Sequence, residues 1–367
     1  MDGYTKEELC LIWLDSFEGL EYKHKQTLIN LSNSIDATSI LEKGKDYILT
    51  SLNANVYSTL KNSLNVEYMQ YVLDNLRKNN VVAITIKSSK YPQSLVESKV
   101  PPLVLYTVGN QELLEEQNIF AIVGSRKSLP QSLSIASDYA KTLIKAGFTL
   151  VTGIAQGVDQ RVVETALSQD AKIICVMAGG ILNVYPKSNT NLLEKVAKSK
   201  NGLVIAEHPP QVTALPYMFP LRNRIFSGLA KGVLIVSAGK KSGTLWTANY
   251  AVEYGKDVFA IPYSVGVSSG EGCNSLIKQG ANLTDSPQDI LDYYQIEIKQ
   301  TNENIITEEE KRVIKILSNG KMHVEKISAT LGKKTFEIMP TISIMEIKGI
   351  ICKSGNICQL TRTYSEE

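Results

Sequence analysis

The chain has 367 residues, enough for about two to three domains of ordinary size. Hydrophobic residues make up 43% and charged residues 21%, which is typical of a folded protein and excludes a largely disordered, collagen-like or coiled-coil chain. Because 39 Lys and Arg nearly balance 37 Asp and Glu, the net charge is only +2. Any nucleic-acid binding must therefore come from a local cluster of cations rather than from the charge of the whole chain.

The first residues, 1–20, mix acidic and apolar side chains and lack the basic start, apolar run and cleavage site of a signal peptide. No stretch approaches the roughly 18 uninterrupted apolar residues that a membrane span needs. We therefore expect a cytoplasmic protein without membrane contact. The five cysteines are scattered, which indicates reduced structural thiols, and the three histidines are too dispersed to form a metal site with them.

Residues 1–80 show the apolar spacing of short helices, as in Leu9, Ile12 and Trp13, with Asn- and Ser-rich breaks between them. This pattern predicts a small helical domain of SAM-like or helix-hairpin-helix-like type. The spacing of apolar residues changes at Val81, where short apolar runs and proline pairs begin. We place a domain boundary there.

Residues 81–290 are predicted to form an extended Rossmann-like domain. Short apolar runs alternate with amphipathic helical segments, which favours an α/β fold with a mostly parallel sheet and helices on both faces. The predicted strands are 119–123, 148–151, 173–177, 203–206, 233–236 and 258–261. In such sheets ligands bind beyond the carboxyl ends of the strands.

The last part of the chain reverses its charge. Residues 291–310 are rich in Asp and Glu and are predicted to be an acidic linker. Residues 311–367 follow with ten Lys and Arg against three Glu between 311 and 362, a net +7. Three helices and a hairpin around Ser354-Gly355-Asn356 predict a winged-helix-like module. It could contact duplex DNA, or serve only as a dimer-supporting or protein-binding domain.

Glycine-rich turns follow the first three predicted strands. They contain Gly124-Ser125-Arg126, then Gly153 and Gly157, then Gly179-Gly180. Such turns let backbone N–H groups approach a phosphate at a helix N-terminus, although connections of this kind also need glycine for geometry alone. Neither the dinucleotide fingerprint nor the P-loop motif is present, so NAD and ATP are disfavoured and no cofactor is expected.

Four cations are predicted to face the same edge of the sheet: Arg126, Lys187, Arg222 and Arg224. Each could be an ordinary solvated charge, but together with Tyr185 and Phe219 they provide what a single-strand groove needs, cations for phosphates and rings for bases. The two rings could equally be core residues.

Catalytic patterns are scarce. No Ser-His-Asp or Cys-His arrangement is credible, because His208 is the only histidine of this domain. Asp159 is expected to cap the helix that follows it. A carboxylate pair from Glu207 and Glu253 stays open but has no support in the sequence.

Taken together, these segments resemble the DprA (Smf) family of bacterial DNA-processing proteins. The resemblance runs from about residue 90 to about 285 and rests on the strand-end motifs already given and on Tyr185-Pro186 with Asn189, Phe219-Pro220 with Arg222-Asn223-Arg224, Ser242-Gly243-Thr244-Leu245, and Gly272 with Asn274, Leu276 and Ile277. It implies a non-enzymatic protein that binds single-stranded DNA, forms a homodimer and loads the RecA recombinase in natural transformation.

The resemblance also implies site residues. We expect DNA contacts at Gly124, Ser125, Arg126, Gly153, Gly157, Lys187, Asn189, Phe219, Arg222 and Arg224, and a dimer contact at Leu276 and Ile277. One departure is that Val162-Val163 stands where the family commonly has Ala-His. Any role of that histidine is absent here.

One alternative shares the same fold. Ser242-Gly243-Thr244 also looks like the turn of the "lonely guy" nucleoside-monophosphate phosphoribohydrolases, which place a catalytic Glu three residues after the Thr. Here that position is Thr247, so a phosphate or nucleotide could bind without the carboxylate that stabilises an oxocarbenium-like centre.

Overall fold

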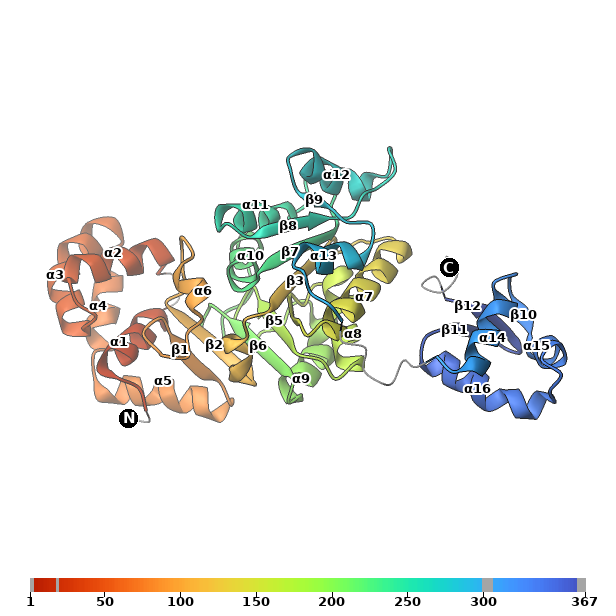
Figure 1. The fold of residues 1–367 in the computed structure, drawn as a ribbon. Helices are drawn as coiled ribbons and strands as arrows, with labels where there is room; N and C mark the ends of the chain where they lie inside the picture. Colours follow the sequence, from red (N-terminus) through yellow and green to blue (C-terminus); the bar gives the residue numbers. More distant parts are fainter. Residues whose placement is uncertain (1–2, 18–19, 299–305, 362–367) are drawn as a thin grey trace. The chain divides into compact units, whose positions relative to one another are not determined.

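The computed structural model describes residues 3–17, 20–298 and 306–361 (Figure 1). The chain divides into two compact units, residues 1–297 and residues 298–367. In the described residues, no helix is both long and apolar enough to cross a membrane.

The first unit begins with five helices. Four of them start at side chains that accept a hydrogen bond from the first helical turn, Thr5, Asp36, Asn53 and Asn65, which is why each begins where it does. The helices are α1 (Lys6–Asp15), α2 (Tyr22–Ser32), α3 (Ala37–Ser51), α4 (Ala54–Asn62) and α5 (Val66–Lys78). The predicted boundary near residue 80 falls between α5 and the first strand, but the helices belong to the same compact unit as the sheet.

A nine-stranded sheet forms the centre of this unit. Its order is β1-β2-β6-β5-β4-β3-β7-β8-β9, with β1 and β2 antiparallel to their neighbours and the other strands parallel. The strands are β1 (Val82–Thr85), β2 (Val104–Gly109), β3 (Ile119–Gly124), β4 (Thr149–Thr152), β5 (Ile173–Met177), β6 (Gly202–Ala206), β7 (Gly232–Ser237), β8 (Asp257–Ala260) and β9 (Asn282–Leu283). The expected α/β fold with a mostly parallel sheet is confirmed.

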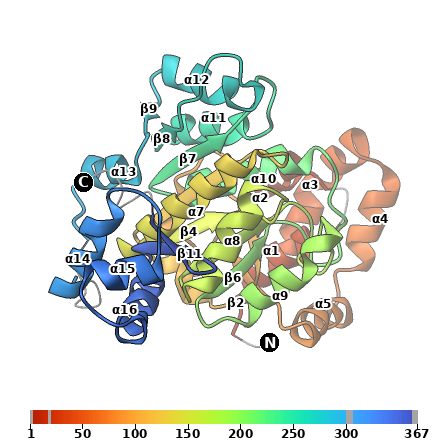
Figure 2. The ribbon, with the colours of Figure 1, turned by 90° about the vertical axis from the view of Figure 1, so that its right-hand side faces the viewer.

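Helices cover both faces of the sheet, so its central strands are buried on both sides. One face packs against α6 (Gln93–Val96), α10 (Met218–Leu229), α11 (Leu245–Glu253) and α12 (Glu271–Lys278). The other packs against α7 (Pro130–Lys145), α8 (Val158–Ser168) and α9 (Thr190–Lys198), seen in front of the strands in Figure 2, while α13 (Pro287–Tyr293) packs on α7. Three short 3₁₀ helices complete the unit: η1 (Gln111–Glu115), η2 (Lys187–Asn189) and η3 (Ser268–Gly270).

The second unit contains α14 (Glu308–Leu317), β10 (Met322–His323), α15 (Val324–Thr330), α16 (Thr335–Ile347), β11 (Ile351–Ser354) and β12 (Ile357–Leu360). The strands pair antiparallel in the order β10-β12-β11, and the predicted hairpin at Gly355 joins β11 to β12. The structure places residues 308–310 of the predicted linker in the first turn of α14, whereas residues 299–305 of the linker and the basic Arg362 lie outside the described residues. The assignment to the winged-helix class stays a prediction.

Candidate nucleic-acid interface

A cavity of about 720 Å³ opens at the carboxyl ends of β3, β4 and β7. Gly124 ends β3, Ala155 follows β4, and Ser242 to Thr244 lie in the loop that follows β7. The strands β4 and β7 flank β3 on opposite sides. After β3 the chain first adds β4, β5 and β6 on one side and then adds β7, β8 and β9 on the other. The cavity therefore lies where the strand order reverses, the usual ligand position in open parallel sheets.

The mouth of the cavity combines cations with aromatic rings. The exposed guanidinium of Arg126 lies 4.6 Å from the centroid of the Phe219 ring, and Tyr185 meets that ring edge-on at 5.7 Å. The Tyr185 side chain is 54% exposed, so the pair is not a core contact. Lys127, which the sequence analysis missed, also lines the cavity, and its place beside Arg126 in the loop after a strand was the available signal.

Arg222 lies in the wall of the cavity rather than at its rim. Its side chain is buried, donates from Nη1 to the Val176 carbonyl at 2.5 Å and lies 4.3 Å from the centroid of Phe226. Burial lowers the pKa of Arg222 to about 10, partly opposed by Asp159, so the guanidinium stays charged at neutral pH. It gives the cavity wall a fixed positive charge.

The sequence suggested that Asp159 caps α8, but in the structure it does not. Gly157 is the N-cap residue, and the carboxyl group of Asp159 is buried in the first turn of the helix. Burial raises the pKa of Asp159 to about 6, and the charge of Arg222 and a hydrogen bond from the Ala155 backbone limit the rise. Asp159 thus balances the charge of Arg222 and fixes the turn after β4.

Steric packing accounts for two of the strand-end glycines. Gly157 has a positive φ of 87°, and a Cβ there would lie 2.4 Å from the Ser125 carbonyl oxygen. A Cβ at Gly153 would lie 2.4 Å from the Asp159 carboxylate. Neither glycine lines the cavity, in contrast to Gly124 and Ser125.

Two other predicted contacts also lie outside the cavity lining. Lys187 is exposed on η2, two residues beyond Tyr185. Asn189 is buried and donates to the Ile154 carbonyl at 2.8 Å, so its amide holds the loop after β4.

The amide N–H of Ser125 donates to Ser237 Oγ at 3.1 Å. This N–H group, one of the backbone donors predicted to contact DNA, therefore already has a partner within the chain.

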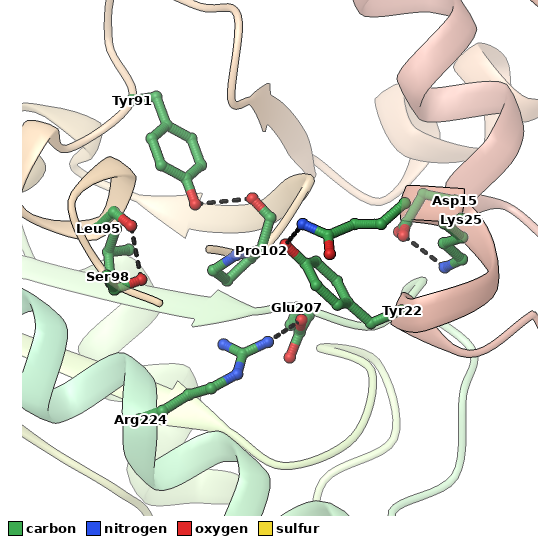
Figure 3. A network of polar contacts seen from close by, with 10 residues as sticks. Asp15, Tyr22, Lys25, Tyr91, Leu95, Ser98, Pro102, Glu207 and Arg224 are labelled. Carbon is green, nitrogen blue, oxygen red and sulfur yellow. Dashed lines mark hydrogen bonds and ion pairs between the residues drawn. The ribbon is translucent and has the colours of Figure 1, made fainter. Parts of the chain in front are cut away.

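The expectation that four cations share one rim is wrong for Arg224. Positions two apart on a helix point to different sides, so α10 directs Arg222 to the cavity and Arg224 away from it. Arg224 is buried in an ion pair with Glu207, close to Tyr22 of α2 (Figure 3). The same region holds the buried pair of Lys25 with Asp15 at 2.6 Å. Arg224 therefore belongs to the packing between the helical segment and the sheet.

The two residues of the predicted dimer contact also differ in their surroundings. Leu276 is buried in the core beneath α12, so its side chain is engaged within one chain. Ile277 is partly buried against the same core. A dimer contact at this place would have to use Ile277 and its exposed neighbours.

The hydrolase alternative gains no support from the geometry. Thr247 lines the cavity where those enzymes place their Glu, and among the lining residues, all within the described part of the chain, Asp159 is the one carboxylate. The other candidate acids lie elsewhere: Glu207 is paired with Arg224, and Glu253 with Lys99 at 2.5 Å. Within the described residues no three potential metal ligands gather.

Comparisons with known proteins identify the family of this chain. The family model for DNA recombination-mediator protein A matches residues 82–295, more than half of the chain. The DNA processing protein DprA of Bacillus subtilis is 34% identical over 237 residues, covering 64% of this chain and 79% of that protein. Protein Smf of Synechocystis is 35% identical, covering 62% of this chain and 57% of its own length.

Solved structures give the same result. DprA of Streptococcus pneumoniae superimposes with a TM-score of 0.67 at 28% identity, over 81% of this chain and 99% of that one. DNA processing protein A of Helicobacter pylori, whose structure is described as giving insight into its single-stranded DNA binding mode, matches with a TM-score of 0.53 at 28% identity over 59% of this chain and 95% of that one. The chain therefore belongs to the DNA recombination-mediator protein A family of DNA-processing proteins.

Proposed function

We propose that this protein binds single-stranded DNA in the cavity at the carboxyl edge of the sheet and holds it without cleaving it. The observation that carries the proposal is the cavity mouth, where Arg126 lies over the ring of Phe219, Tyr185 meets that ring, and Lys127 lines the same cavity. Cations bind phosphates without reading the sequence, and aromatic faces stack any base. Buried Arg222 lies behind them and stays charged at neutral pH, with Asp159 as its counter-charge.

The bound strand then serves as a substrate for recombination. We propose that the protein protects incoming single strands and loads the RecA recombinase onto them during natural transformation, acting as a homodimer. The family membership and the single-strand binding described for the Helicobacter pylori relative support this assignment. The lack of a catalytic carboxylate at Thr247 favours binding over hydrolysis at this cavity.

The test is a competition between single-stranded and duplex oligonucleotides in fluorescence anisotropy over a salt series. We expect preference for the single strand and an affinity that falls steeply with salt, because phosphate contacts release counterions. A nucleoside-monophosphate hydrolysis assay on the same preparation should show no turnover. Turnover together with weak binding of DNA would refute the proposal.

The RecA step needs its own assay. RecA filament assembly on strands coated with single-strand-binding protein should start sooner when this protein is present. A lag unchanged at saturating protein would refute loading and leave single-strand binding standing.

A further inference from the structure

An aromatic ladder runs along α11 from the edge of the cavity. Trp246 and Tyr250 are four residues apart and therefore lie on one face of the helix, and Tyr254, the C-cap residue four positions further, continues the row. The ring centroids of Trp246 and Tyr250 are 6.3 Å apart, and those of Tyr250 and Tyr254 are 6.2 Å apart. Trp246 is 50% exposed and Tyr250 is partly exposed, so the core does not account for these two rings, whereas Tyr254 lies near Arg224 and Glu207 at the inner end of the row.

The ladder starts where the candidate DNA site ends. Thr244 and Thr247, which flank Trp246 in sequence, line the cavity. The loop just before them carries Lys240 and Lys241, both exposed. Cations at one end of a row of rings are the combination that proteins use to bind single strands without sequence preference.

We propose that the ladder of Trp246, Tyr250 and Tyr254, with Lys240 and Lys241, is a second subsite that stacks the bases of a single strand leaving the cavity. This inference rests on the proposed function and extends its site along α11. The ring spacing exceeds the roughly 3.4 Å between neighbouring bases of a duplex strand. A strand that places successive bases on successive rings is therefore stretched beyond the spacing of a stacked duplex, which a duplex would not permit.

The fluorescence of Trp246 can report on whether this subsite is occupied. Of its two tryptophans, Trp13 is 3% exposed and donates to Ser63 Oγ at 3.0 Å, whereas Trp246 is half exposed. A base stacked on Trp246 should quench its fluorescence. We expect an oligo(dT) of about 16 nucleotides to quench the wild-type protein and one of about 4 nucleotides, long enough only for the cavity, to bind without quenching.

Substitutions then test the energy of the subsite. Trp246→Ala should weaken binding of the longer strand by about 5- to 140-fold, the range that about 1–3 kcal/mol per stacked base gives, and leave the shorter strand unaffected. Trp246→Phe should retain most of the affinity. Val252→Ala, at an exposed position on another side of the same helix, should bind both strands like the wild type.

Failure of this inference is distinguishable from failure of the proposed function. The ladder subsite would be overturned if Trp246→Ala bound both lengths normally, or if the longer strand did not quench the fluorescence. The proposed function would still stand in that case if Arg126→Ala lost binding of both lengths. If Arg126→Ala also bound normally, the cavity itself would be the wrong site. Equal quenching by duplex DNA would overturn the single-strand argument for the ladder.

Discussion

Replacing Arg126 with alanine isolates the cation at the cavity mouth. The side chain is exposed and lies 4.6 Å from the Phe219 ring centroid, a contact worth about 0.5–1 kcal/mol to folding at an exposed site. Loss of one charge-assisted contact to a phosphate removes about 1.5–3 kcal/mol of binding. We therefore expect Arg126→Ala to bind single strands about 12- to 140-fold more weakly and to lower the slope of log affinity against log salt by about 0.7.

The assay is fluorescence anisotropy of a labelled single strand at several salt concentrations. Lys231→Ala is a matched control, because Lys231 is also exposed and also lies 4.6 Å from a ring centroid, that of Tyr294, but stands at the amino end of β7. It should bind with wild-type affinity and slope. If Arg126→Ala kept both affinity and slope, or if both variants lost them equally, the reasoning about the cavity mouth would be refuted.

Three further results are expected. Gly157→Ala should lower the free energy of unfolding in urea by about 1–3 kcal/mol more than Gly147→Ala, since both have φ near 86° but only the first Cβ meets backbone; equal losses would contradict the packing argument. Arg224→Met should cost up to about 3–5 kcal/mol by leaving the mostly buried Glu207 carboxylate unpaired, and adding Glu207→Gln should recover most of it in the same urea titration. Because Asp159, with a pKa of about 6, is neutral below that pH, wild-type DNA affinity should rise from about pH 7 to about pH 5, whereas Asp159→Asn should show a flatter profile in anisotropy.

The central strands were predictable because they are buried on both faces. Unbroken apolar runs such as 173–177 therefore match β5 residue for residue, and the other five predicted strands differ from the observed ones by one residue at one or both ends. The strands β1, β2 and β9 were missed, because β1 has an exposed first residue, β2 begins just after a proline pair and ends in half-buried residues, and β9 is only two residues long. Short edge strands are specified by their partners more than by their own sequence.

The site was predictable in position but not in orientation. Glycines and cations after successive strands indicate one edge of the sheet, and Arg126 and Phe219 do meet there. The direction of a side chain depends on the element that carries it. Without a predicted helix at α10, nothing separated Arg222, which lines the cavity, from Arg224, which pairs with Glu207.

The most direct test of the account is photocrosslinking of the full chain to a single-stranded oligonucleotide that carries 5-bromouracil, followed by mass spectrometry of the peptides. The account predicts crosslinks at the rings of Tyr185 and Phe219, lost when unlabelled single strand competes and retained with duplex competitor. Crosslinks confined to residues 306–361, with none at the cavity, would contradict it.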